Sequence, residues 1–112
     1  CAGVDVEIQQ NGYLIKDVRN NRELVTAVEK NMDFIGEHHI PRDLTQGIGS
    51  TDVGNVTQAL PAAQFYIGVG EGLGTHTAAF AEAAGGEAGR RALTAAVKVL
   101  AMTGLDMMSG RS

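Results

Sequence analysis

The chain has 112 residues, of which 44% are hydrophobic and 20% charged, and its net charge is -4. The length suits one small domain with its own core, and the composition excludes a chain that is disordered throughout. The acidic balance disfavours nucleic acid and acidic membrane surfaces as main partners, because both require a basic patch.

The single cysteine cannot form an internal disulfide, so a reducing, cytoplasmic compartment is expected. No apolar run approaches the roughly 20 residues that cross a bilayer, and no membrane partner is expected. The chain starts with Cys1 instead of Met, and a strand pattern follows at once. This start predicts a truncated chain.

The first third of the sequence predicts two strands and a helix. Residues 3–9 alternate apolar and polar side chains, the period of a strand with one buried face. An Asn-Gly pair then favours a turn, and residues 13–18 form a second short strand. A helix is expected to begin after Asn20 or Asn21, either of which can cap it, and to end at Gly36, because apolar residues recur at helical spacing between these points.

Residues 37–49 contain a proline, two glycines and no periodicity, so they are predicted to be a connector and the best candidate domain boundary. A short helix is expected after it, capped within Ser50 to Asp52 and ending before Pro61. The apolar run PAAQFYIGV, residues 61–69, is then typical of a strand buried on both faces.

The last part of the chain predicts two helices separated by Gly85 and Gly86. The first is short, over residues 77–84, and the second is longer. One face of the longer helix is expected to pack closely on a sheet, with small side chains among its residues Leu93, Ala96, Val97, Leu100, Gly104 and Met107. The predicted class is therefore α/β. A central strand needs neighbours on both sides, and this chain has too few, so partner strands are expected elsewhere.

Four alternate glycines at 68, 70, 72 and 74 follow the apolar run. They differ from the G-x-G-x-x-G spacing of dinucleotide sites, no P-loop lysine follows, and Glu71 adds negative charge where a phosphate would lie. A flexible exit from a buried strand explains them better. A nucleotide-binding domain remains an alternative that rests on the glycines alone.

His76 is placed where a strand exit meets a helix start, at the edge of a sheet that carries ligand sites in open α/β folds. Imidazole is also a common zinc ligand, but one histidine makes no metal site. A solvent-exposed or helix-start histidine is the competing interpretation. The pair His38-His39 fits a polar connector, because adjacent residues of an extended chain point in opposite directions. Cys1 has no histidine partner nearby and is not expected to be a nucleophile.

Three segments resemble a known family: GSTDVGNVTQALPAAQFYIGVG, THTAAFAEAA and AVKVLAMTGLDMM. They are similar to the C-terminal end of the aminoacylase and carboxypeptidase family of dinuclear metallopeptidases, in its amidohydrolase and dipeptidase branch. Upstream, Tyr13, Asn21, Leu24 and the helix ending in Gly36 look like the end of that family's inserted lid, or dimerisation, domain. The resemblance covers essentially the whole chain.

The resemblance implies that residues 1–40 are the C-terminal part of an α+β lid domain. Residues 41–112 would be the C-terminal part of a catalytic domain built of a sheet and helices. His76 matches a histidine that binds one of the family's two metal ions, zinc or manganese. Ser50, Thr51 and Asp52 match a segment lining the substrate site, and Asn55 lies just beyond it. The other metal ligands and the catalytic glutamate belong to an N-terminal half, so no catalytic residue is expected in this chain.

The leading hypothesis is therefore a fragment of a metal-dependent amidohydrolase or dipeptidase, inactive on its own. The parent enzyme, a homodimer, would hydrolyse an amide bond in a dipeptide or an N-acyl amino acid. A metal-bound hydroxide needs several ligands and a general base, which one histidine cannot supply. The alternative from another class is a noncatalytic assembly module, in which the edge of the strand 3–9 pairs with another chain.

Overall fold

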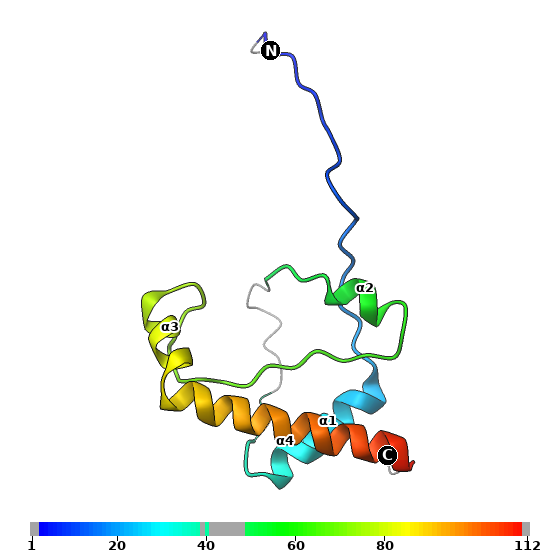
Figure 1. Cartoon of the computed structure of the whole chain (residues 1–112). Helices are drawn as coiled ribbons and strands as arrows, with labels where there is room; N and C mark the ends of the chain where they lie inside the picture. The colour runs from blue at the N-terminus through cyan, green and yellow to red at the C-terminus, as the bar shows by residue number, and fades with distance from the viewer. Residues whose placement is uncertain (1–2, 39, 41–48, 111–112) are drawn as a thin grey trace.

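The computed structural model describes residues 3–38, 40 and 49–110 (Figure 1). It contains four helices: α1 (Arg22–Phe34), α2 (Val53–Thr57), α3 (Ala78–Gly85) and α4 (Glu87–Ser109). The remaining described residues form turns, bends and extended chain, and no strand is found among them.

The helix ends follow the capping residues of the sequence. The Asn21 side chain accepts a hydrogen bond from the backbone N–H of Leu24 and begins α1, as predicted. Thr77 does the same for Phe80 and begins α3. The predicted break between the last two helices is confirmed, because α3 ends at Gly85 and α4 begins after Gly86.

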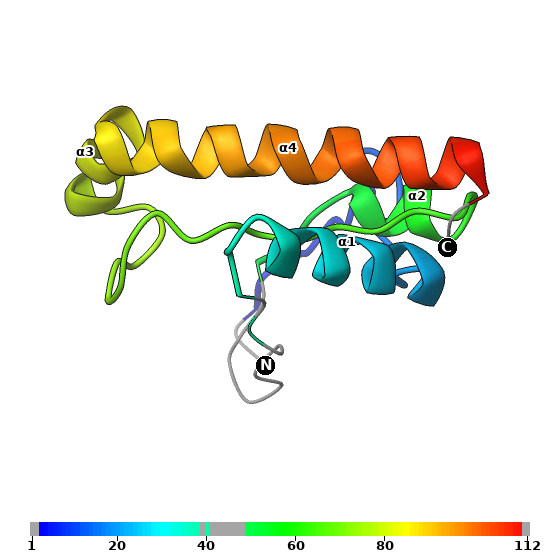
Figure 2. The same cartoon turned by 90° about the horizontal axis from the view of Figure 1, so that it is seen from below.

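The core lies where α1 contacts α4. Figure 2 shows the two helices running one above the other. All buried apolar side chains of the described residues come from this pair: Ala27, Val28, Ala92, Ala95 and Val99. Val99 is fully buried, and the alanines around it let the helix axes approach closely. The core is therefore small.

Two buried polar residues fix the register of this contact. The Nδ2 of Asn31 donates to Thr103 Oγ1 at 3.1 Å and to Asp106 Oδ2 at 3.0 Å. Asn31 and Thr103 are each 7% exposed, so both amide protons are satisfied away from water. Sliding one helix along the other would leave these groups unpaired, at a cost of about 1–3 kcal/mol for each buried group.

The face of α4 that was expected to pack on a sheet is open to solvent over much of its area. Leu93, Val97 and Leu100 are each more than half exposed. The stripe that is buried instead is the neighbouring one, formed by Ala92, Ala95, Val99 and Thr103 against α1. The helix therefore has two apolar stripes, and the described residues fully cover only the first.

The predicted strands are extended chain without strand neighbours. Residues 3–9 project from the body as an arm (Figure 1), and residues 62–69 run along α4 in both views. A strand is defined by its hydrogen-bonded ladder, and these segments have none within the described residues. The α/β class of a larger whole stays a prediction.

Helix α4 is long and apolar enough to cross a membrane by length and composition. Its most apolar 18-residue window has a mean hydropathy of 1.3, so the expectation that no such run exists was wrong. One such helix is weak support for a membrane span, since the core helix of a soluble protein has the same properties. Here one stripe of α4 is the main source of the core.

The predicted lid and catalytic parts share this one core. Helix α1 belongs to the predicted domain 1–40 and α4 to the predicted domain 41–112, yet they pack directly on each other. Most of the predicted connector, residues 41–48, lies outside the described residues, as does His39. The domain boundary therefore stays a prediction.

Replacing Asn31 by alanine should lower the free energy of unfolding by about 1–3 kcal/mol, because Thr103 loses its buried partner. Urea denaturation followed by circular dichroism would measure the change. The exposed neighbour Lys30→Ala is the matched control and should shift stability by less than about 0.5 kcal/mol. Equal effects of the two substitutions would contradict a specific role for the buried amide.

Candidate functional site

The segment that was expected to line a substrate site is attached to the body through α2. Asn55 accepts a hydrogen bond from the backbone N–H of Lys16 at 2.9 Å and donates to the Leu14 carbonyl at 3.0 Å. Its amide thus pairs with the extended chain 14–16 as a neighbouring strand would. The side chain that sequence reasoning placed beside a substrate is engaged with backbone.

Further side chains continue this attachment. Gln58 donates to the Asp17 carbonyl oxygen at 2.8 Å and to its carboxylate at 2.7 Å, and Thr57 accepts from the backbone N–H of Arg19 at 3.0 Å. The hydrogen bond from the Arg19 side chain lowers the pKa of Asp17, and the Gln58 bond acts in the same direction. This exposed carboxyl therefore stays ionised as an acceptor.

Asn20 and Asn21, which follow in the chain, are attached to the extended segment that leads toward His76. The Asn20 amide forms a matched pair with Gln64, accepting from its N–H at 2.9 Å and donating to its carbonyl at 3.0 Å. The backbone N–H of Asn21 donates to the Ala62 carbonyl at 2.8 Å. We call these contacts, from Leu14–Asn21 to Asn55–Gln64, the polar clamp. No sequence pattern predicted these contacts.

Gly54 is buried at the centre of the polar clamp. A Cβ atom at this position would overlap the carbonyl group of Lys16, so only glycine lets α2 approach the extended chain this closely. The Gly-Asn pair of the STDVGN motif therefore has a structural explanation. Gly54 allows the approach, and Asn55 satisfies the backbone groups that the approach brings together.

The three residues before α2 are differently placed. Ser50 and Asp52 are exposed, and neither side chain forms a hydrogen bond within the described part of the chain. Thr51 Oγ1 accepts from the backbone N–H of Val53 at 3.3 Å. Ser50 and Asp52 thus offer a hydroxyl and a carboxylate to solvent at the start of α2, where a polar ligand can reach them.

His76 lies in the loop between the extended segment and α3. It is exposed and has a φ of 62°, and it is the non-glycine residue with positive φ among those described. The loop turns at Gly72, with a φ of 68°, and closes where Thr77 Oγ1 donates to the Gly74 carbonyl at 2.7 Å. The imidazole has no hydrogen-bond partner in the described residues, so both ring nitrogens are accessible.

The structure does not bring the predicted metal and substrate residues together. Helix α2 and the loop before α3 lie at opposite ends of the extended segment 62–69 in both views (Figures 1 and 2). No group of three metal-binding side chains gathers in residues 3–38, 40 and 49–110. His38 Nδ1 lies 3.8 Å from Asp33 Oδ1. The assignments of His76, Ser50, Thr51, Asp52 and Asn55 stay predictions.

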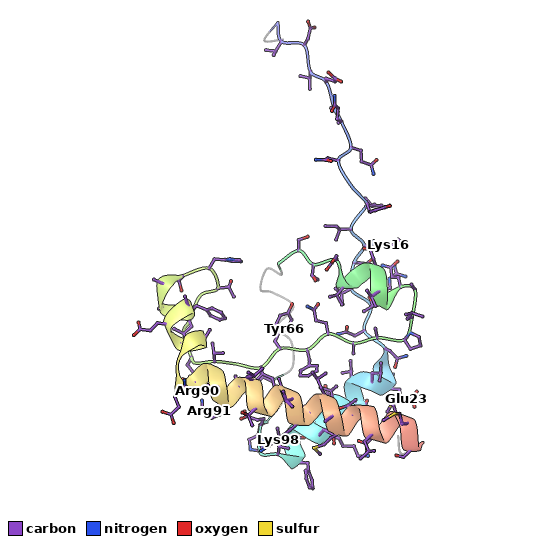
Figure 3. The ribbon with its side chains drawn as sticks, viewed as in Figure 1. Lys16, Glu23, Tyr66, Arg90, Arg91 and Lys98 are labelled. Carbon is purple, nitrogen blue, oxygen red and sulfur yellow. The ribbon has the colours of Figure 1, made fainter. Side chains whose placement is uncertain are left out.

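A basic surface was missed at the sequence level. Arg90, Arg91 and Lys98 line a hollow of about 420 Å³ beside the C-terminal end of α1, together with Glu37 and Glu87. Figure 3 shows the three basic side chains along the same side of α4. Lys98 follows Arg91 by seven residues and Arg90 by eight, which is about two helical turns, and this spacing could have revealed the stripe. Two acidic side chains in the same hollow offset most of its charge.

Two curated proteins are similar to this chain over nearly its whole length. Xaa-Arg dipeptidase from Mus musculus is 33% identical over 110 residues, which are 96% of this chain and 26% of that protein. Xaa-Arg dipeptidase from Homo sapiens is also 33% identical over 110 residues, or 25% of its length. The chain thus spans about a quarter of the length of these relatives. No family model matches it. No solved structure matches it either.

Substitution of Gly54 by alanine should destabilise the polar clamp by about 1–3 kcal/mol, as overpacking does. Loss of exchange protection at the Lys16 amide, which Asn55 accepts from, would measure it. Gly104→Ala is the matched control, because nothing lies within 4 Å of its added Cβ. In α4 this control should stabilise by about 0.5–1 kcal/mol. Unchanged protection at Lys16 in Gly54→Ala would refute the close approach.

Proposed function

We propose that this chain is part of a metal-dependent dipeptidase or amidohydrolase, and that His76 donates one ligand to its metal centre. The single observation that carries the proposal is the similarity to the two Xaa-Arg dipeptidases over 96% of the chain. The relatives are about four times as long as this chain. Most residues of such an active site would therefore come from a part of the parent protein that corresponds to the other three quarters of the relatives.

The surroundings of His76 suit a side chain that contributes one bond to a metal ion whose other ligands come from other residues. The imidazole stands on an exposed loop at the end of an extended apolar segment, and no side chain of the described residues occupies its nitrogens. Neutral imidazole binds zinc through either ring nitrogen. The left-handed backbone at His76 turns the chain into α3 within two residues, which keeps the imidazole outside the helix.

The described residues do not fit a complete two-metal centre. A catalytic zinc site needs about three protein ligands and an open position, and in the described part of the chain His76 belongs to no group of three such side chains. No reaction step can therefore be assigned to this chain's own residues. The two ions, zinc or manganese, would be held mainly by groups of the parent protein.

The substrate proposed for the parent is a dipeptide or an N-acyl amino acid. The name of the relatives adds a specific candidate, a dipeptide whose second residue is arginine. Ser50, Thr51 and Asp52 are the residues proposed to meet it, since the hydroxyl of Ser50 and the carboxylate of Asp52 are open. Asn55 is proposed to act through the polar clamp, by holding this segment in place. A cytoplasmic homodimer is the proposed form of the parent.

A chimera tests this proposal directly. The 110 residues matched in mouse Xaa-Arg dipeptidase would be replaced by the corresponding residues of this chain, and hydrolysis of an Xaa-Arg dipeptide measured with zinc or manganese. The chimera should be active. His76→Ala should lower kcat/KM by more than about 100-fold, since loss of even an indirect metal contact costs 10–100-fold.

His38→Ala is the matched control in the same chimera, because this exposed histidine is paired with Asp33. It should change kcat/KM by less than about twofold. The chain alone should hydrolyse neither Xaa-Arg dipeptides nor N-acyl amino acids under the same conditions. An active isolated chain, or an active chimera that tolerates His76→Ala, would contradict the proposal.

A further inference from the structure

The backbone conformation of His76 needs support from its neighbours. Its φ of 62° lies in the left-handed region, which residues other than glycine rarely adopt. A residue stays in this region only where the surrounding structure over-determines it, and such residues gather at binding and catalytic sites. The contacts made on either side of His76 therefore show what holds its backbone in place.

Thr77, the next residue, is bonded to the chain on both sides of His76. Its Oγ1 donates to the carbonyl oxygen of Gly74 at 2.7 Å and accepts from the backbone N–H of Phe80 at 3.2 Å. The first bond closes the loop before His76, and the second begins α3 after it. One hydroxyl thus fixes the backbone where it enters and where it leaves the left-handed residue.

Helix α3, which begins after Thr77, is itself held against α4. Gly89, in the first turn of α4, lies so close to α3 that a Cβ atom on it would overlap the carbonyl group of Ala84. Helix α4 in turn carries most of the buried core, including Val99. A hydroxyl that joins the loop to α3 therefore joins it to the best supported part of the chain.

We propose that Thr77 is the positioning residue of His76, because its hydroxyl holds the left-handed turn that presents the imidazole to the metal centre of the parent protein. This inference rests on the proposed function, since it takes His76 as a metal ligand. Groups around a metal-binding histidine usually orient it by accepting a hydrogen bond from its other ring nitrogen. Thr77 would act through the backbone instead, by fixing the direction in which the Cα–Cβ bond of His76 leaves the loop.

The competing explanation is that Thr77 only begins a helix. Asn21 provides the comparison, because its side chain accepts from the backbone N–H of Leu24 and begins α1 in the same way. The residue before Asn21 does not have a positive φ, unlike the residue before Thr77. Loss of the cap at Asn21 should therefore destabilise a helix without disturbing His76.

The chimera with mouse Xaa-Arg dipeptidase allows the two explanations to be separated. Thr77→Val keeps the shape of the side chain and removes the hydroxyl, whereas Thr77→Ser keeps the hydroxyl. Competition with a chelator would measure the zinc affinity of each metal-free chimera. Thr77→Val should weaken zinc binding about 10–100-fold, as loss of a group that orients a metal ligand does. Thr77→Ser and the cap control Asn21→Ala should each change it by less than about threefold.

A second variant and a second measurement keep the test independent of folding and of bound metal. Glycine begins a helix about as well as threonine does, so Thr77→Gly removes the hydroxyl with little loss of capping. It should weaken zinc binding as Thr77→Val does. Crystal structures of the metal-free chimeras should show a positive φ at His76 in Thr77→Ser and a negative φ in Thr77→Val.

Three results would overturn the positioning role and leave the proposed function intact. One is zinc affinity within about threefold of the unmodified chimera in both Thr77→Val and Thr77→Gly. Another is a positive φ at His76 retained in metal-free Thr77→Val. The third is an equal loss of zinc affinity in Asn21→Ala, which would show a general effect of a lost cap. An active chimera that tolerates His76→Ala would instead remove the proposed function, and this inference with it.

Discussion

The contact between α1 and α4, fixed by Asn31, is the interaction on which the rest of the structure depends. Five small or medium apolar side chains form the whole described core, so its specificity comes from the buried amide of Asn31 and its two acceptors on α4. By taking one stripe of α4, helix α1 leaves the adjacent apolar stripe free. That division of one helix into a covered and an open side creates a hollow along residues 63–69.

The polar clamp explains how residues 14–21 and 55–64 are held together without a sheet. Side-chain amides of Asn20, Asn55 and Gln58 take the place of strand neighbours, and Gly54 permits the approach. The clamp ends at Gln64, and the apolar segment then runs unpaired to the loop that carries His76. A residue proposed as a metal ligand thus stands at the end of a stretch of backbone that forms no hydrogen bond within the described residues.

The sequence predicted the helices better than their packing. The cap at Asn21, one of the two residues expected, and the Gly85-Gly86 break depend on local sequence and were predicted correctly, whereas the cap formed by Thr77 was not predicted. The contact between α1 and the stripe of Ala92, Ala95 and Val99 was not predicted, because the two apolar stripes of α4 are adjacent and periodicity cannot tell which one α1 covers. The packing of the other stripe on a sheet stays a prediction. The polar clamp was missed, since side-chain-to-backbone pairs 38–44 residues apart leave no periodic signal. For the candidate site, exposure of His76 was anticipated as an alternative, whereas its left-handed backbone was not.

The role of His76 is tested most directly by a crystal structure of the active dipeptidase chimera soaked with zinc. Anomalous scattering at the zinc edge would locate the ions independently of the protein model. The account predicts an ion about 2.0–2.1 Å from a ring nitrogen of His76, the usual zinc–imidazole distance. Fully coordinated zinc ions, with the His76 imidazole left in solvent, would contradict it.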